Sequence, residues 1–166
     1  MAGENSVVIA VEDMATATIV AVEGARVAMD KDNTATQVVL LHVLDHHPIM
    51  GAVLGMSGQC MPLTATSEEV EALFGATEGA LRAEFEALGR PTPVIRREVA
   101  DGDPAAAIEQ VAAEYDAAVI VLGARRPHAF GRLVHPDIRA HVATHAPCRV
   151  HVAALQETET RAPIRG

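Results

Sequence analysis

The sequence predicts an α/β protein built on an open parallel β-sheet with helices on both faces. Short apolar runs rich in Val, Ile and Leu alternate along the chain with segments of helical periodicity, which is typical of parallel sheets with right-handed crossovers. The composition is 49% hydrophobic but only 2% aromatic, and an aliphatic core suits strands that are covered on both faces. The 166 residues fit one domain of ordinary size.

Five segments have the short, apolar, β-branched character of buried strands. In chain order they cover residues 6–11, 37–43, 94–99, 117–122 and 149–153. The fourth segment is the most apolar of the set, and it ends at Gly123.

Four segments between these strands have helical patterns. They cover residues 15–30, 67–88, 104–115 and about 137–145. Ser67 is predicted to cap the second helix. Asp103 is predicted to cap the third helix, with Pro104 at its first position. The Ala-rich residues 105–107 of that helix are expected in the core.

The ends of the first and fourth strands form the candidate site. In open α/β sheets, ligands bind beyond the carboxyl ends of the strands, at the point where the strand order reverses. That rule selects Glu12, Asp13 and Met14 after the first strand, and the segment that follows Gly123 after the fourth.

Composition excludes several classes of function. The net charge of −9 argues against nucleic-acid binding, because such proteins carry a basic surface. No apolar run approaches the ~18–20 residues of a membrane span, and residues 1–5 lack the start of a signal peptide. The two cysteines, Cys60 and Cys148, form no recognisable disulfide framework. We therefore expect a reduced, cytoplasmic protein that binds neither nucleic acid nor membrane.

The charge is unevenly distributed along the chain. Residues 1–122 carry 6 Lys and Arg against 19 Asp and Glu, a balance of −13, whereas residues 123–149 carry five Arg against one acid, a balance of +4. A local cationic patch on an acidic protein can concentrate a small anion. The alternative is that these arginines pair with acids elsewhere on the surface. They are Arg125, Arg126, Arg132, Arg139 and Arg149.

Several stretches, taken in order, carry a family resemblance. They are Val8-Ile9-Ala10-Val11-Glu12, Leu40-Leu41-His42-Val43, Gly102-Asp103-Pro104, Val119-Ile120-Val121-Leu122-Gly123 and His145-Ala146-Pro147-Cys148-Arg149-Val150. Together they resemble the universal stress protein family over about residues 6–153.

The resemblance implies a fold, a domain arrangement and a partner. The fold is a flavodoxin-like or Rossmann-like five-stranded sheet of strand order 3-2-1-4-5. The partner is a second copy, paired through the fifth strand, Arg149 to Ala153. We expect a flexible N-terminus at residues 1–5, the universal stress protein domain at 6–155, and a polar, disordered tail at 156–166.

The segment after Gly123 departs from the pattern of the family's nucleotide-binding members, which is Gly-x2-Gly-x9-Gly-(Ser/Thr). Gly123 fills the first position, but Arg126 stands at the second glycine, Pro136 at the third, and Asp137 at the hydroxyl residue. Glu12 stands where the family has an aspartate that touches the nucleoside. The candidate nucleotide or anion site comprises Glu12, Val43, Gly123, Arg125, Arg126 and Asp137.

These substitutions change how phosphate could be held. In the family pattern, glycines let backbone N–H groups approach phosphate at a helix N-terminus. Pro136 has no N–H to donate, and Asp137 places a negative charge where phosphate would sit. Arg126 blocks close approach of the backbone, although a guanidinium can itself bind phosphate. We expect that the usual ATP mode is lost and that no cofactor is required, with ATP or AMP as the alternative ligand.

The function predicted from these residues is a non-enzymatic stress-response protein that acts by binding, with no catalytic residue. The first alternative is an ATP- or AMP-binding regulator that uses the loop from Gly123 to Asp137. The second is a weak nucleotide hydrolase, which would need a positioned water and usually Mg²⁺. No acidic residue has a recognisable metal role for that reaction.

Two histidines raise a metal hypothesis. His141 and His145 are four residues apart on the last predicted helix, the spacing of helical zinc pairs. No acidic or cysteine ligand is recognisable beside them in the sequence. We interpret them as surface or capping histidines and expect no metal site.

Overall fold

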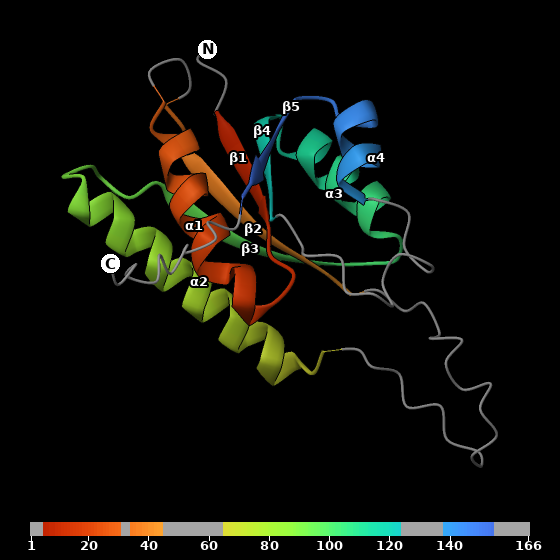
Figure 1. Ribbon diagram of the computed structural model, residues 1–166, viewed down its shortest axis with the longest axis horizontal. Coiled ribbons are helices and arrows are strands. Elements are labelled where there is room, and N and C mark those ends of the chain that lie inside the picture. Colours follow the sequence, from red (N-terminus) through yellow and green to blue (C-terminus); the bar gives the residue numbers. More distant parts are fainter. Residues whose placement is uncertain (1–4, 31–33, 45–64, 124–137, 155–166) are drawn as a thin grey trace, which may run out of the picture.

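The computed structural model describes residues 5–30, 34–44, 65–123 and 138–154, which form five strands and four helices (Figure 1). Their order along the chain is β1 (Ser6–Ala10), α1 (Met14–Ala28), β2 (Gln37–Leu44), α2 (Ser67–Ala87), β3 (Val94–Asp101), α3 (Pro104–Glu114), β4 (Ala117–Gly123), α4 (Ile138–His145) and β5 (Arg149–Ala153).

The strands form one parallel sheet in the order β3-β2-β1-β4-β5. This confirms the predicted fold class and strand order, which corresponds to the first five strands of a doubly wound sheet. Helices α1 and α2 cover one face, and α3 and α4 cover the other (Figure 1). The strand order reverses between β1 and β4, so the two neighbouring strands lead to helices on opposite faces.

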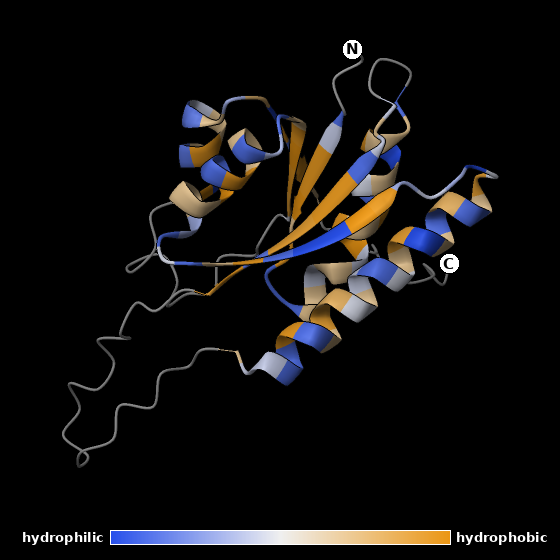
Figure 2. Cartoon of the chain, turned by 180° about the vertical axis from the view of Figure 1, so that it is seen from behind, coloured by the Kyte–Doolittle hydropathy of each residue, from blue (hydrophilic) through white to orange (hydrophobic). Residues whose placement is uncertain are grey.

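The core has two parts, one on each face of the sheet. Alternate residues of β1 point to opposite faces, so that Ile9 belongs to the cluster under α1 and α2 while Val8 belongs to the cluster under α3 and α4. Both side chains have 0% exposure, and burying a side chain of this size stabilises a fold by about 1.5–3 kcal/mol. The central strands are accordingly the most hydrophobic part of the chain in Figure 2.

The start of α2 differs by one residue from the prediction. Thr66, not Ser67, is the N-cap. The Thr66 hydroxyl accepts a hydrogen bond from the Glu69 N–H at 3.2 Å, and the Glu69 carboxylate accepts one from the Thr66 N–H at 2.7 Å. This reciprocal capping box needs a Glu or Gln three residues after the cap. Thr66 has Glu69 there, whereas Ser67 would have Val70.

The start of α3 agrees with the prediction. The Asp103 carboxylate accepts a hydrogen bond from the Ala106 N–H at 3.0 Å, and Pro104 occupies the first turn. The expectation that Ala106 is in the core is wrong, because it faces solvent while Ala105 and Ala107 are buried. A helix on a sheet turns only one stripe toward the core.

Some predictions concern residues outside the described ranges. These are the flexibility of residues 1–4 within the predicted N-terminus 1–5, the disorder of the tail 156–166, and the start of the last helix at Pro136 or Asp137. Among the described helices, none combines the length and the apolar character needed to cross a membrane.

Candidate functional site

The candidate site lies at the carboxyl edge of the sheet, where β1 and β4 end side by side. β1 pairs with β2 on one side, with Ile9 opposite Leu40, and with β4 on the other, with Ile9 opposite Val121. The chain leaves β1 for α1 on one face, and α4 after β4 packs on the opposite face. In doubly wound sheets, ligands bind beyond the strand ends at such a divergence.

A buried histidine fixes the end of β1. The Val11 N–H donates to the Leu41 carbonyl at 2.8 Å, and His42 Nδ1 lies 2.7 Å from the Val11 carbonyl oxygen. A carbonyl only accepts hydrogen bonds, so Nδ1 carries the proton and donates. His42 is 7% exposed, and such a bond contributes about 0.5–1.5 kcal/mol. The histidine of the His-Val pair seen in the sequence therefore has a positioning role: His42 holds the backbone immediately before Glu12.

The two acidic residues after β1 have different environments. The Asp13 carboxylate caps α1, accepting hydrogen bonds from the Thr16 N–H at 2.9 Å and from the Thr16 hydroxyl at 3.0 Å. Glu12 is exposed at the edge of the sheet, as is Met14, whose exposed fraction is 59%. The predicted site therefore presents one carboxylate, Glu12, that is not part of the helix cap.

Gly123 has a packing role at the end of β4. A Cβ atom at this position would lie 3.2 Å from Val20 Cγ1 and 3.4 Å from Thr16 Cβ, both on α1. Contacts this short are tight for a Cβ, so the glycine allows α1 to lie close against the end of β4. The presence of Gly123 therefore does not by itself indicate a phosphate site, because the α1–β4 contact already requires a small residue.

The structure places three of the predicted site residues and leaves the others outside its described ranges. Val43 is half-buried near the end of β2, opposite Ala100 of β3, and packs against the core under α3 and α4. Because β1 lies between β2 and β4, Val43, Glu12 and Gly123 come from three adjacent strand ends at one edge. Arg125, Arg126 and Asp137 fall within residues 124–137, which are not described.

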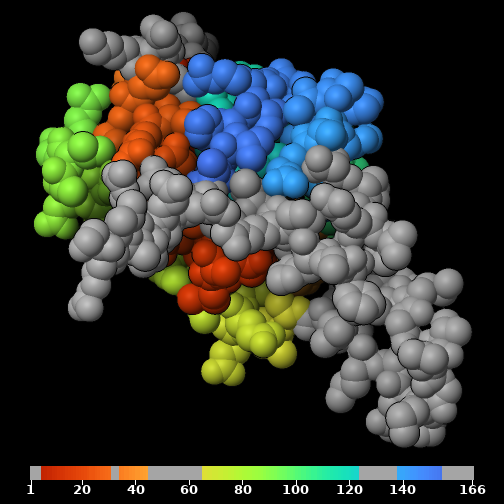
Figure 3. Space-filling model, viewed as in Figure 1, coloured from red at the N-terminus to blue at the C-terminus, as the bar shows by residue number. Residues whose placement is uncertain are grey.

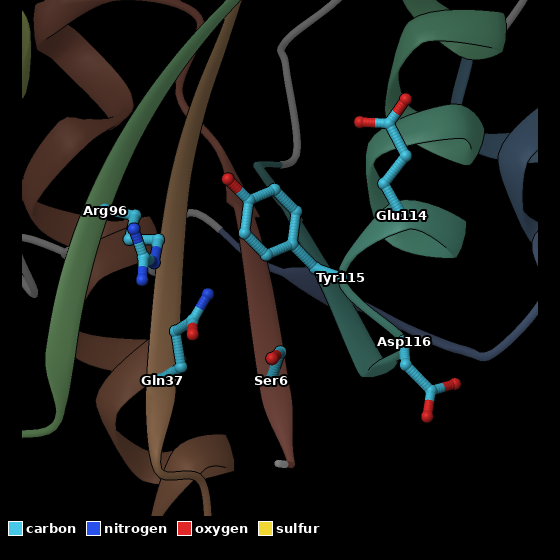
Figure 4. A pocket seen from close by; sticks show the side chains of 6 residues that line it. All are labelled: Ser6, Gln37, Arg96, Glu114, Tyr115 and Asp116. Atoms are coloured by element: carbon cyan, nitrogen blue, oxygen red, sulfur yellow. The ribbon is translucent and has the colours of Figure 1, made fainter. Parts of the chain in front are cut away.

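A hollow of about 450 Å³ lies at the opposite, amino edge of the sheet (Figure 4). The sequence does not predict it, since its residues come from the first residues of separate strands, from the end of α3 and from the turn before β4. The Tyr115 hydroxyl there donates to the Glu98 carboxylate, and this hydrogen bond raises the pKa of Tyr115 above its usual value. The lining residues are Ser6, Gln37, Arg96, Glu114, Tyr115 and Asp116.

The strand order, with helices on both faces of a parallel sheet, defines a doubly wound α/β domain of the Rossmann-like class. Residues 5–154 match the model of the Universal stress protein family. Because this match spans most of the chain, the protein belongs to the universal stress protein family. The resemblance seen in the sequence motifs is thereby confirmed.

Solved structures of low sequence identity share the fold. A universal stress protein in complex with cAMP has a TM-score of 0.61 and 15% identity, with 92% of this chain and 98% of that chain covered. The Archaeoglobus fulgidus universal stress protein in complex with dAMP has a TM-score of 0.57 and 18% identity, covering 89% and 96%. A family member from Arabidopsis thaliana with AMP bound has a TM-score of 0.50 and 17% identity, covering 96% and 97%.

Among curated proteins, none matches this sequence. At 15–18% identity the structural likeness shows the fold alone.

Proposed function

We propose that this chain is a non-enzymatic stress-response protein that acts by binding, and that its nucleotide site has lost the usual ATP mode. The observation that carries the proposal is the sequence immediately before α4. Pro136 and Asp137 precede Ile138, the first residue of α4, where the family pattern has Gly and Ser or Thr. A proline removes one backbone donor, and the aspartate brings a negative charge to the phosphate position.

The charge of Asp137 supports the same proposal. Glu12 is also exposed at this edge, but the family pattern has an acid at that position too, so Glu12 does not distinguish this chain from a nucleotide-binding member. Two like charges 4 Å apart repel by about 1 kcal/mol in water and about 4 kcal/mol near a protein surface. A triphosphate bound at the family's phosphate position would meet this repulsion from Asp137.

An ATP- or AMP-binding regulator is the second candidate. Three proteins of the same fold were solved with cAMP, dAMP or AMP bound. In this chain Arg125 and Arg126 supply guanidinium groups that can bind phosphate in a bidentate manner. The loop would then hold an anion through side chains where the family pattern uses backbone N–H groups.

We also propose that the protein is cytoplasmic and forms a homodimer through β5. β5 is an edge strand of the sheet, with Val152 42% exposed. It reaches the surface between α1 and α4 (Figure 3). An open edge with an exposed aliphatic residue invites pairing with another strand. Light scattering at micromolar protein that shows only monomer would contradict the dimer.

A thermal-shift titration tests the two candidate functions. We expect no change in Tm with millimolar ATP or AMP, with or without Mg²⁺. A ligand at 100 times its Kd stabilises the native state by about 2.7 kcal/mol, which is several degrees in Tm for a chain of this size.

The matched variants are Arg126→Ala, in the loop, and Arg90→Ala, an exposed arginine just after α2. A Tm increase that disappears in Arg126→Ala and persists in Arg90→Ala would overturn the first candidate and support the second.

A further inference from the structure

The surface between α3 and α4 gathers one carboxylate and two imidazoles. Glu109 comes from α3, and His141 and His145 come from α4. One ligand atom from each of the three side chains lies within 4.8 Å of the other two. His141 Nε2 is 3.6 Å from Glu109 Oε1. The acidic neighbour that could not be recognised in the sequence is thus supplied by a different helix.

Glu109 has an unusual environment for a surface acid. Its Oε1 atom is buried and has no hydrogen-bond partner, although 23% of the side chain is exposed. An unsatisfied buried polar atom costs about 1–3 kcal/mol, more when it is charged. His141 Nε2 lies 3.6 Å from this oxygen, beyond ordinary hydrogen-bonding distance. This oxygen is therefore available to a cation placed between the two helices.

The ring of His145 is oriented as in a metal-binding histidine. Its Nδ1 lies 3.0 Å from the His141 carbonyl oxygen, and because a carbonyl only accepts, Nδ1 donates. The proton is thereby fixed on Nδ1, and Nε2 keeps its lone pair. Metal-binding histidines commonly donate their second ring N–H to a carbonyl in this way.

The helices that carry the three residues are packed against each other. Val142, next to His141, is fully buried and shares a core cluster with Ile108, next to Glu109. The two helices lie side by side in Figure 1. The three ligands therefore lie on two packed helices, and helices position side chains better than loops do.

We propose that Glu109, His141 and His145 form a binding site for a divalent transition-metal ion such as Zn²⁺. Two imidazoles and one carboxylate are a ligand set that Zn²⁺ uses with an open fourth position. Zn–ligand bonds of about 2.0–2.2 Å put tetrahedral ligand atoms about 3.3 Å apart. The 3.6 Å separation of His141 Nε2 and Glu109 Oε1 is close to this value.

Binding needs only side-chain rotations. The two imidazole rings are stacked, with centroids 4.3 Å apart and planes at 25°, so the His141 ring must turn for both lone pairs to meet one ion, while His145 keeps its hydrogen bond to the His141 carbonyl. His141 is exposed and can turn without disturbing the core. The ion would join α3 to α4. Hard cations such as Mg²⁺ prefer oxygen ligands and are not expected here.

The simpler interpretation is an ion pair between Glu109 and a protonated His141, with His145 stacked beside it. That arrangement satisfies the same carboxylate without a metal. The two interpretations differ in one measurable respect. A metal site makes Zn²⁺ affinity depend on all three residues, whereas an ion pair gives no reason for such a dependence.

Calorimetric titration of tag-free, chelator-treated protein with Zn²⁺ separates the two interpretations. The variants His141→Ala and Glu109→Gln each remove one proposed ligand. The matched control is His151→Ala, which breaks a His–Glu contact of 3.2 Å with Glu23 at similar exposure but with no third ligand described. We expect both site variants to weaken the tightest Zn²⁺ binding at least about tenfold, since loss of even an outer partner costs 10–100-fold. The control should leave it unchanged.

The chain has eight histidines, and others can bind Zn²⁺ weakly. The decisive quantity is therefore the difference in Zn²⁺ affinity between the site variants and the control. Unchanged affinity in His141→Ala or in Glu109→Gln overturns the three-ligand site. An equal loss in His151→Ala also overturns it. Circular dichroism checks that each variant is folded, and Mg²⁺ in place of Zn²⁺ should give no heat of binding.

Discussion

Helices α2 and α4 cover opposite faces of the same sheet, and they are held by very different amounts of buried surface. α2 is 21 residues long and buries six side chains, whereas α4 is 8 residues long and buries only Val142. The buried residues of α2 are Val70, Leu73, Phe74, Thr77, Leu81 and Phe85. At about 1.5–3 kcal/mol for each large apolar side chain, α2 is attached far more firmly than α4.

The polar contacts also differ between the two helices, because they are more complete beside α2 than beside α4. On α2, Glu78 binds Arg82 on its own helix and Arg97 on β3, both at 2.8 Å. The hydrogen bond from Arg82 is the main cause that lowers the pKa of Glu78. On the other face, Glu109 keeps a buried oxygen without a hydrogen-bond partner beside α4. Glu78 is thus fully paired beside α2, whereas Glu109 has one oxygen without a hydrogen-bond partner beside α4.

This difference matters because α4 follows the predicted ligand loop. Elements that bind ligands or move are drawn from the less stable parts of a fold. A helix held by one buried residue can respond to an anion at its N-terminus or to a metal ion on its outer surface. α2, by contrast, serves to cover the sheet.

The largest expected effect tests the attachment of α2. Phe74→Ala should lower the free energy of unfolding by about 3–5 kcal/mol, because it removes a 1% exposed ring and leaves a cavity. This is a large part of the 5–15 kcal/mol typical of a domain. Urea unfolding followed by circular dichroism measures the loss.

The control is Phe74→Leu, which keeps most of the volume and should cost less than about 1.5 kcal/mol. Similar losses for the two variants would show that the ring of Phe74 is not what anchors α2.

A smaller and more local effect is expected on the other face. Val142→Ala removes the one buried side chain of α4, at a cost of about 2 kcal/mol from two methyl groups and the space they leave. Because α4 has no second anchor of that kind, amide hydrogen exchange should speed up in α4 and stay unchanged in α2. Mass spectrometry of peptic fragments resolves the two helices. Faster amide exchange in both α2 and α4 would mean that the two helices open as one cooperative unit. The proposed difference in their attachment would then be wrong.

Much of the fold could be predicted because buried parallel strands leave a clear mark in sequence. Residues 7–9 of β1 and 38–40 of β2 are each fully buried, so these strands appear as unbroken apolar runs. The cap at Asp103 was equally clear, since proline follows it directly. The predicted cap of α2 is one residue late because Thr66 and Ser67 both have a capping hydroxyl. The choice depends on which of them has a glutamate three residues later.

The proposed metal site and the candidate site at the strand ends were less predictable, each for a physical reason. Glu109 and His141 are 32 positions apart in the chain, and only the packing of α3 on α4 brings them together. The role of His42 depends on a hydrogen bond to Val11 on the neighbouring strand, which no local pattern encodes. The substitutions at Arg126, Pro136 and Asp137 were evident from the family pattern alone, but their geometry lies outside the described residues.

The smallest expected effect concerns the capping box of α2, a feature for which α4 offers no described counterpart. Thr66→Ala removes the hydroxyl that accepts from the Glu69 N–H and should cost about 1 kcal/mol in the free energy of unfolding. Thr66→Ser keeps the hydroxyl and should be nearly neutral.

The contribution of the box should also depend on pH. The hydrogen bond from the Thr66 N–H lowers the pKa of Glu69 below its ordinary value of 4.5. A folded pKa below the unfolded one means that the contribution is complete above pH 4.5 and is lost as the pH falls through the lowered pKa. Urea unfolding at pH 7 and at pH 3 should therefore show a smaller difference between the wild type and Glu69→Gln at the lower pH. A difference that stays constant across this range would mean that the carboxylate charge adds nothing to the cap, and that α2 depends on its buried side chains alone.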